Sequence, residues 1–320
     1  MSENGKLAVN GKRERRKFPV LAVAVMLVLA LLGVYAIVSW SRPTSVLAQG
    51  QREFWLNASA KQITLSPGNV WDAWTYEGTV PGPTLRIRVG DLVTIHFRND
   101  LDLRHSIHLH GLRYSIENDG SQAYPDSMPG PGASYTYRFE ATRPGLFYYH
   151  CHSSDGGFPI NYHILKGLYG AIVVYPADEW PPKTDYEFVQ FFGEAMMDPG
   201  IAYNINGAQA REHDLMDLIE TNGYAATVDA LKGLGIPVVP VGQQLTFYLV
   251  GIGNEYHSWH LHGGNPVYVN GEAIEGDVVP LGPGTAVTAK VTLTYPGIWL
   301  IHCHLVAHAD GGMVTLVIAE

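Results

Sequence analysis

The chain contains an internal duplication, in which the first half repeats in the second at a spacing of 152 residues. Val89-Gly90 falls on Val241-Gly242, and the alignment then runs without gaps over long stretches. A period of this length is too long for a solenoid repeat and fits two homologous domains of ordinary size. We therefore expect one domain over residues 49–178 and a second over residues 179–320, with the boundary in the proline-rich segment 176–185.

Each half is expected to consist of short strands. Residues 91–98 and 134–140 alternate between apolar and polar side chains, which is the pattern of a half-buried strand. The chain contains 35 Gly and 20 Pro, enough for the many turns that short strands require. The fold class predicted from these features is all-β.

The N-terminus differs from the rest of the chain. Residues 1–18 carry six Lys/Arg and two Glu, whereas residues 19–40 are uncharged and mostly apolar. An apolar helix of that length spans a bilayer, with its basic flank on the cytoplasmic side. Small residues at 45–48 offer a cleavage site, so residues 1–48 are either a signal peptide or a membrane anchor. We expect the remainder to work outside the cytoplasm, in the periplasm, at the cell surface or secreted, and to meet the membrane only through this helix.

Twelve of the fourteen histidines fall in an arrangement that both halves repeat. Each half contains His-x2-His-x-His, then His-Cys-His, then one more histidine downstream. Residues i and i+2 of a strand point to the same face, so the two imidazoles of each His-Cys-His point one way and the cysteine points the other. Such a segment can hold a metal cluster on one side and a second metal ion, through sulfur, on the other.

The second half adds a characteristic ligand set around Cys303. His308 and Met313 follow at intervals of five residues, and His257 begins the upstream histidine motif. Two imidazoles, a thiolate and a distant thioether are typical of a type 1, or blue, copper site. Zinc is the alternative for a Cys/His cluster, but it favours Cys-x2-Cys pairs, which this sequence lacks. A disulfide to Cys151 is the other alternative in an exported protein, and the histidines flanking both cysteines argue against it.

The four His-x-His units, with His-Cys-His last, resemble the multicopper oxidases, and the two-domain length resembles the bacterial small laccases. The likeness covers about residues 50–320. It implies copper as the cofactor, two cupredoxin-like Greek-key β-sandwich domains and a trinuclear copper cluster between domains. By motif position, the cluster ligands would be His108 and His260 for the type 2 copper, His110, His150 and His304 for one type 3 copper, and His152, His262 and His302 for the other.

The same resemblance implies an assembly and two further site residues. In the two-domain family the cluster lies between the first domain of one subunit and the second domain of the next, so a homotrimer is implied. Asp119 would relay protons to reduced oxygen, and Tyr114 would lend an electron. Considered alone, a tyrosine and an Asp-Gly pair are more typical of core packing and of a turn.

The first half departs from the small laccases because it retains a cysteine. His105, Cys151 and His163 match the type 1 ligands of the second half, and Leu168 stands where that half has a methionine. Residues 163–173 also resemble the type 1 loop of the copper nitrite reductases. These features predict a second type 1 site with a non-coordinating axial leucine and a raised reduction potential. The loop between the cysteine and the last histidine is seven residues longer than its counterpart, so a relic cysteine without copper is the alternative.

The predicted function is a laccase-like oxidase that takes single electrons from a phenolic, aromatic or metal-ion substrate and reduces O2 to water. A copper nitrite reductase is one rival, but its His-Cys motif lacks the second histidine, and it carries an aspartate where Ile107 or Leu109 stands. A non-enzymatic copper or electron-transfer protein is the other rival, and it would not need eight cluster ligands.

The net charge of the chain limits the classes of molecule that it is expected to bind. The chain carries −9 in total and its first 48 residues carry +5, so the remainder carries −14, which argues against nucleic acid and suits cationic or neutral reductants. Glu255, Glu272, Glu275 and Asp277 are candidates for a cation site near the second type 1 copper. Ordinary solvated loop charges are the alternative interpretation of these four residues.

Overall fold

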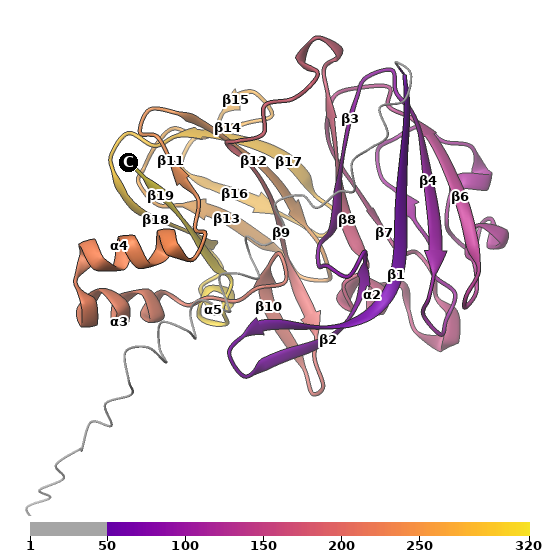
Figure 1. Cartoon of the computed structure of the whole chain (residues 1–320), viewed down its shortest axis with the longest axis horizontal. Coiled ribbons are helices and arrows are strands. Elements are labelled where there is room, and N and C mark those ends of the chain that lie inside the picture. The colour runs from indigo at the N-terminus through magenta and orange to yellow at the C-terminus, as the bar shows by residue number, and fades with distance from the viewer. Residues whose placement is uncertain (1–49) are drawn as a thin grey trace, which may run out of the picture.

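The computed structural model describes residues 50–320, which form two β-sandwiches, one from each half of the chain (Figure 1). The predicted signal or anchor helix of residues 19–40 lies outside the described residues. Within residues 50–320, no helix has both the length and the apolar character needed to cross a membrane.

The first sandwich consists of two four-stranded sheets. One has the order β2 (Asn69–Tyr76), β1 (Gln51–Ser66), β4 (Leu92–Asn99), β6 (Ser134–Glu140). The other has the order β3 (Gly82–Arg88), β8 (Tyr169–Tyr175), β7 (Gly145–His150), β5 (His108–Leu109). Strand β1 is parallel to β4 and β3 is parallel to β8, whereas the other pairs are antiparallel.

The second sandwich repeats this pairing with extra strands. Its six-stranded sheet has the order β10 (Ile201–Ile205), β9 (Glu187–Met196), β12 (Gln244–Gly251), β17 (Ala286–Thr292), β14 (Tyr268–Val269), β15 (Glu272–Ala273). Its five-stranded sheet has the order β11 (Val238–Val239), β19 (Val314–Ala319), β18 (Gly297–Cys303), β13 (His257–Leu261), β16 (Val278–Leu281). Here β9 is parallel to β12 and β11 is parallel to β19, so the duplication seen in the sequence recurs in the sheet topology.

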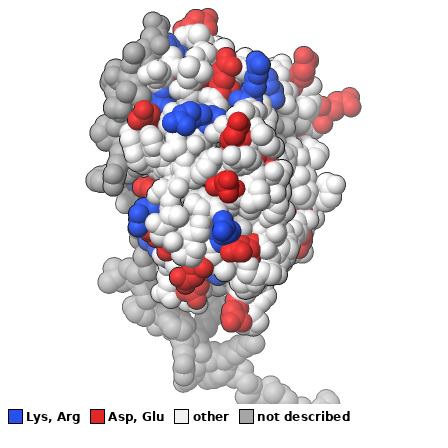
Figure 2. Space-filling view, turned by 90° about the vertical axis from the view of Figure 1, so that its right-hand side faces the viewer, with Lys and Arg blue, Asp and Glu red and all other residues white. Residues whose placement is uncertain are grey.

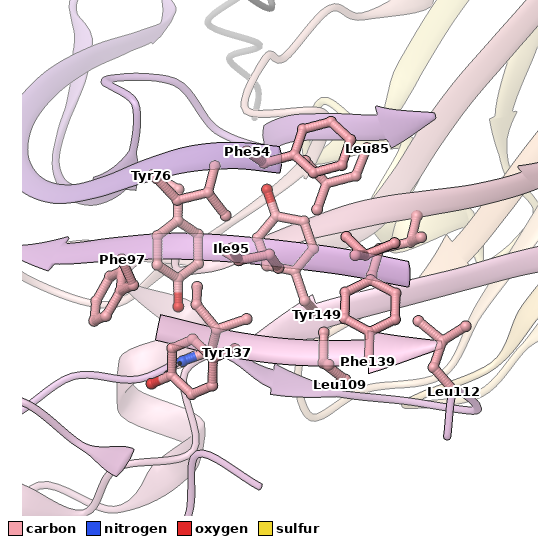
Figure 3. Packing of buried hydrophobic residues seen from close by; sticks show 14 of the residues in the cluster. Phe54, Tyr76, Leu85, Ile95, Phe97, Leu109, Leu112, Tyr137, Phe139 and Tyr149 are labelled. Carbon is pink, nitrogen blue, oxygen red and sulfur yellow. Dashed lines mark hydrogen bonds between the residues drawn. The ribbon is translucent and has the colours of Figure 1, made fainter. Parts of the chain in front are cut away.

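Aromatic side chains link the two sheets of the first sandwich. Tyr76 contacts both Phe97 from its own sheet and Tyr149 from the opposite sheet (Figure 3). All three rings are at most 1% exposed. The hydroxyl of Tyr76 donates to the carbonyl oxygen of Ser106 at 2.6 Å, and the hydroxyl of Tyr137 accepts the N–H of Ile107 at 3.1 Å. Core tyrosines therefore satisfy their own polar groups and fix the segment that carries the first histidine motif.

The two sandwiches share an apolar interface. Every residue of β8 is buried, because alternate side chains serve different cores. Ile172 and Val174 face the first sandwich core, whereas Val173 packs in a cluster with Phe191 and Val250 of the second half. Burial on both faces explains why this strand is continuously hydrophobic.

Helices are the main departure from the all-β expectation. A helical hairpin, α3 (Glu212–Asn222) and α4 (Tyr224–Gly233), stands between β10 and β11, where the first half has only a short connection (Figure 1). Its buried Leu218 and Leu231 pack against Leu316 and Ile318 of β19. Shorter helices are α2 (Ile160–Leu165), α5 (Val306–Asp310), and the 3-10 turns η1 (Ile116–Asn118), η2 (Pro125–Ser127), η3 (Asp155–Gly157) and η4 (Ala177–Glu179).

Charged side chains are mixed on the surface of the first sandwich. Figure 2 shows acidic and basic groups interspersed on the face turned toward the viewer, without a basic stripe. Nucleic-acid binding would call for a continuous basic footprint. This face offers none.

Candidate metal centres

The second sandwich brings His257, Cys303 and His308 together in its core. His257 begins β13, Cys303 ends β18 and His308 lies on α5. The Nδ1 atoms of the two histidines are 3.2 Å apart, and that of His308 is 3.7 Å from the cysteine Sγ. Met313 is fully buried in the same core, and its carbonyl oxygen accepts the N–H of Cys303. The structure thus groups all four residues predicted for this type 1 site.

Hydrogen bonds prepare Cys303 to bind a metal. Burial raises the pKa of this thiol, but hydrogen bonds from His257 and from the N–H of Ser258 outweigh burial and lower the pKa below its usual value. For His257 burial acts in the opposite direction and lowers the pKa. Hydrogen bonds to Cys303 and Glu194 outweigh burial and raise the pKa of this imidazole above its usual value. The thiolate is the metal-binding form of cysteine, so this environment favours the form that is needed.

Two carboxylates contact the Nε2 atoms of this histidine pair, the outer nitrogens that face away from Cys303. Glu194 on β9 lies 2.9 Å from Nε2 of His257, and its side chain is 1% exposed. Glu255 lies 3.2 Å from Nε2 of His308 and accepts a hydrogen bond from the Tyr203 hydroxyl. The ring of Tyr203 stacks on that of His308 with centroids 3.9 Å apart. These contacts orient each imidazole and leave its Nδ1 for a metal.

The acidic residues predicted near this site are distributed differently. Glu255 reaches it, whereas Asp277 lies beside His260, with Oδ1 3.4 Å from Nδ1. Glu272 and Glu275 are exposed, in accord with solvated loop charges. Asp277 immediately precedes β16, which places it beside His260 rather than at the type 1 histidines.

The first sandwich groups His105, Cys151 and His163 in the same way. The cysteine Sγ lies 3.6 Å and 3.4 Å from the Nδ1 atoms of the two histidines, which are 3.2 Å apart. All three residues are fully buried. Leu168 is also fully buried, and its carbonyl oxygen accepts the N–H of Cys151, just as that of the methionine does in the second half. Leu168 therefore stands where Met313 stands in the second sandwich, and the longer loop still delivers its histidine, on α2.

Burial controls ionisation at this first-domain site. It raises the pKa of Cys151 to about 11 and lowers the pKa of His105 to about 3 and that of His163 to about 4. The imidazoles are thus neutral, which is the ligand form, whereas the thiol is deprotonated when a metal displaces its proton.

The outer nitrogens of the first-domain histidines have no carboxylate partner. Nε2 of His105 and Nε2 of His163 are buried without a hydrogen bond. The edge of Trp74 contacts both rings, with centroid distances of 4.9 Å and 5.2 Å. Sequence reasoning missed Trp74, along with Glu194 and Tyr203, because all three lie on strands far from the histidine motifs.

Strand register explains this difference between the two sites. Trp74 pairs with Ala60 across β1 and β2, and Tyr203 pairs with Glu194 across β9 and β10. Both pairs occupy equivalent places, because Tyr76 and Ile205, two residues further along their strands, each form the same closing bridge. An Ala/Trp pair in one domain thus replaces a Glu/Tyr pair in the other.

A second group of histidines lies on the other side of each His-Cys-His segment. In the first sandwich, Nε2 of His110 is 2.8 Å from Nε2 of His150. The His108 ring lies beside His152, with centroids 4.7 Å apart. Burial lowers the pKa of His110 to about 4 and that of His150 to about 3, which keeps both rings neutral. We call these four residues the first half-site.

The second sandwich contains a matching second half-site. Nε2 of His262 is 2.9 Å from Nε2 of His302, and the His260 ring lies 5.2 Å from that of His304. Nδ1 of His302 contacts the carbonyl oxygen of Cys303 at 2.9 Å, a bond that leaves Nε2 as the donor for a metal. His304 is exposed in the single chain. The converging imidazoles of both half-sites suit copper.

One chain does not join the two half-sites. Ring contacts link the histidines within each half-site, and among residues 50–320 none links one half-site to the other. The predicted partnership of His304 with His110 and His150 therefore does not occur inside one subunit. The same holds for His152 with His262.

Asp119 and Tyr114 lie at the first half-site. The Tyr114 hydroxyl donates to Oδ1 of Asp119 at 3.2 Å. The same Oδ1 lies 3.7 Å from Nδ1 of His108, and the backbone carbonyl oxygen of Asp119 lies 2.6 Å from that nitrogen. Burial and the neighbouring carboxylate raise the pKa of Tyr114 to about 12. Gly120 has φ +66°, and a Cβ there would lie 2.2 Å from the carbonyl oxygen of Ile107, so the turn needs glycine. Asp119 and Tyr114 thus lie beside His108 of the first half-site, and their roles in proton and electron transfer stay predictions.

Comparison with known proteins agrees with this geometry. The chain matches two family profiles, both described as multicopper oxidase, over residues 57–179 and 235–320. A solved structure titled as a multicopper oxidase is 29% identical with a TM-score of 0.72, covering 88% of this chain and 93% of that one. A copper nitrite reductase from Nitrosomonas europaea is 26% identical with a TM-score of 0.68, covering 84% and 94%.

Curated relatives include the copper-containing nitrite reductase of Neisseria meningitidis serogroup B. It is 30% identical over 267 residues, which is 78% of this chain and 63% of that protein. The chain spans less than two thirds of the length of that protein and of two other curated relatives that it matches. The likeness therefore concerns the two cupredoxin-like domains.

Proposed function

The chain belongs to the multicopper oxidase family, with copper as its cofactor, and we propose that it is a laccase-like member that couples one-electron oxidation of a small reductant to four-electron reduction of O2 to water. The observation that carries the proposal is the arrangement of eight imidazoles in two half-sites. Each half-site is joined through a His-Cys-His segment to a buried Cys/His2 site.

The chain's own residues divide the task between them. When bound, copper supplies single-electron storage at the Cys/His2 sites and the four electrons for O2 at the cluster. His302 and His304 flank Cys303 in the chain, so covalent bonds connect the thiolate of the second-domain Cys/His2 site to two imidazoles of the second half-site. Tyr114 and Asp119 hold a proton-bearing hydrogen bond beside His108. The apolar cores exclude water from the buried ligands.

Nitrite reduction is the second candidate, favoured by the relatives named above and by the first-domain site. A mononuclear copper centre does not call for a histidine directly after each cysteine. This chain has such a histidine in both motifs, His152 and His304. Copper-loaded protein should consume one O2 for every four electrons supplied and should form no nitric oxide from nitrite without O2. Nitrite reduction in the absence of O2 uptake would reverse this order.

The first-domain site is expected to hold copper as well. The three donor atoms of the Cys151 site are grouped as closely as those of the Cys303 site. Two such sites and three copper ions in the cluster give five copper ions per subunit. Cys151→Ser should lower the copper content to four and remove part of the blue absorption. An unchanged spectrum and an unchanged metal content would remove this site from the proposal.

Reductants are proposed to enter mainly at the second-domain site. Glu255 and Tyr203 are positioned to accept a proton or a positive charge next to His308, which suits phenols, aromatic amines and Fe(II). Tyr256, next to Glu255, is 70% exposed. Cys303→Ser should therefore reduce turnover of a bulky phenol by orders of magnitude, and Cys151→Ser should reduce it much less. The reverse ranking in proteins with a full cluster would move the entrance to the first domain.

A further inference from the structure

A shallow hollow of about 310 Å3 lies over the first-domain type 1 site. Its lining includes Lys61, Gln62, Asp72, Trp74 and Lys166, which come from β1, β2 and the residue after α2. The volume is at the lower end of small-molecule sites. We call it the first-domain hollow.

Trp74 connects this hollow to the buried ligands. The indole is half-buried and lines the hollow, and its inner edge contacts His105 and His163. Tyr162 packs edge-on against the indole, with centroids 5.7 Å apart. One aromatic ring therefore separates a molecule in the hollow from both imidazoles.

The charge of the hollow is opposite to that of the chain. Lys166 lies with its ammonium 5.8 Å from the centroid of Trp74, and Lys61 is held by a hydrogen bond to the carbonyl oxygen of Gly78. Asp72 is the acidic residue of the lining, and its carboxylate accepts a hydrogen bond from Gln62. The lining thus carries one net positive charge on a chain of −9.

The equivalent place in the second domain is acidic. Glu194 stands where the first domain has Ala60, and Tyr203 stands where it has Trp74. Glu255 adds a second carboxylate at that site. Since opposite charges attract different reductants, the two type 1 sites differ in the partners that they can accept.

We propose that the first-domain hollow binds a small anionic reductant and that Trp74 conducts one electron from it to the His105–His163 pair. The step is an outer-sphere transfer: the anion loses one electron, copper(II) at Cys151 becomes copper(I), and no bond forms or breaks. This inference rests on the proposed function, because it needs copper in the first-domain site.

Binding is tested without turnover. Hexacyanocobaltate(III), a redox-inert trianion, is titrated calorimetrically into the copper-loaded protein. Reversing both charges with Lys61→Glu and Lys166→Glu should weaken binding at least tenfold, and the milder pair Lys61→Gln and Lys166→Gln should weaken it less. Lys290→Glu, at an exposed position of β17, is the matched control and should change nothing. Equal weakening in the control, or none in the lysine pairs, would overturn the proposal.

Electron transfer is tested in a Cys303→Ser background, where the remaining blue absorption reports the first-domain copper. Anaerobic bleaching by hexacyanoferrate(II) should require at least tenfold more anion for half-maximal rate when Lys61 and Lys166 are both reversed. Trp74→Phe should lower the limiting rate several-fold while the affinity for the cobalt analogue stays the same. A blue protein with unchanged rates would refute this inference alone. A colourless Cys303→Ser protein would refute it together with the first-domain copper site of the proposed function.

Discussion

Glu194 illustrates how a single residue can tune a metal site that it does not ligate. Its carboxylate is buried and bonded to Nε2 of His257, and the N–H groups of Asn254 and Glu255 also donate to it. Burial raises its pKa, but these bonds outweigh burial and lower it, so the carboxylate is ionised. An anionic acceptor increases the basicity of a ligating imidazole and stabilises the oxidised metal.

Glu194→Gln should therefore raise the reduction potential of the second-domain blue centre. A charge-assisted hydrogen bond exceeds a neutral one by about 1 kcal/mol, and for a one-electron couple 59 mV corresponds to about 1.4 kcal/mol, so we expect a rise of roughly 50 mV. A spectroscopic redox titration in a Cys151→Ser background measures it. Glu272→Gln, at an exposed position, is the control, and equal potentials in all three proteins would contradict the prediction.

Acid should destabilise the copper-free protein through its buried histidines. Burial lowers the pKa of His105 and of His150 to about 3, whereas unfolded histidine titrates near 6.5. Below pH 6.5 the unfolded chain takes up protons that the folded chain does not, so stability that is fully present above pH 6.5 is lost as the pH falls toward 3. We expect the free energy of unfolding to decrease by about 3 kcal/mol between pH 6.5 and pH 4 for each such group.

Urea unfolding at several pH values measures this loss. Carboxylates also contribute to acid denaturation, so the informative comparison is with His105→Gln, which removes one of the two groups. Its unfolding free energy should fall less steeply between pH 6.5 and pH 4 than that of the parent. Parallel curves would mean that His105 takes up its proton in the folded state.

The residues that the sequence could predict are those whose spacing is set by one strand. His150, Cys151 and His152 are consecutive residues at and just after the end of β7, and the duplication identifies their partners. Trp74 and Glu194 could not be found in this way, because they reach the type 1 ligands only through the pairing of β1 with β2 and of β9 with β10. A register set by tertiary packing leaves no mark in the local sequence.

Among the elements, the strands were predictable and the hairpin α3–α4 was not. The two halves of the chain align at a shift of 129 residues for Trp74 and Tyr203 but at 152 for Val89 and Val241, so the hairpin is an insertion between these points. The repeat holds no counterpart from which it could be inferred. It begins at the second half-site, where Glu212 lies 4.0 Å from Nε2 of His302.

The hairpin should depend on one buried leucine. Leu231 is fully buried against Leu316 and Ile318, so Leu231→Ala should destabilise the protein by roughly 2–3 kcal/mol through lost contacts and the cavity that remains. Hydrogen exchange should rise first in residues 212–233. Met216→Ala, at a side chain that is 54% exposed, should change stability by less than about 0.5 kcal/mol. Similar effects of both substitutions would show that the hairpin contributes little to the core.

At the scale of the whole molecule, the main feature is the separation of the half-sites. Each chain carries the four histidines of the first half-site on one sandwich and the four of the second half-site on the other, and no ring contact within residues 50–320 links the two sets. His304 is exposed in the single chain, where a second copy would cover it. We predict that head-to-tail contact between the first half-site of one copy and the second half-site of the next closes into a ring, with the homotrimer as the expected size.

Subunit mixing tests this arrangement directly. His110→Ala disables only the first half-site, and His302→Ala disables only the second, so homogeneous preparations of either variant should lack O2 reduction. In mixed rings, an intact first half-site of a His302→Ala chain meets an intact second half-site of a His110→Ala chain. Random mixing at equal amounts makes about a quarter of the sites whole, so coexpressed protein should recover about a quarter of wild-type O2 uptake. A cluster built within one chain cannot be restored by mixing, because every chain carries a lesion, and no recovery in verified mixed rings would exclude the shared site.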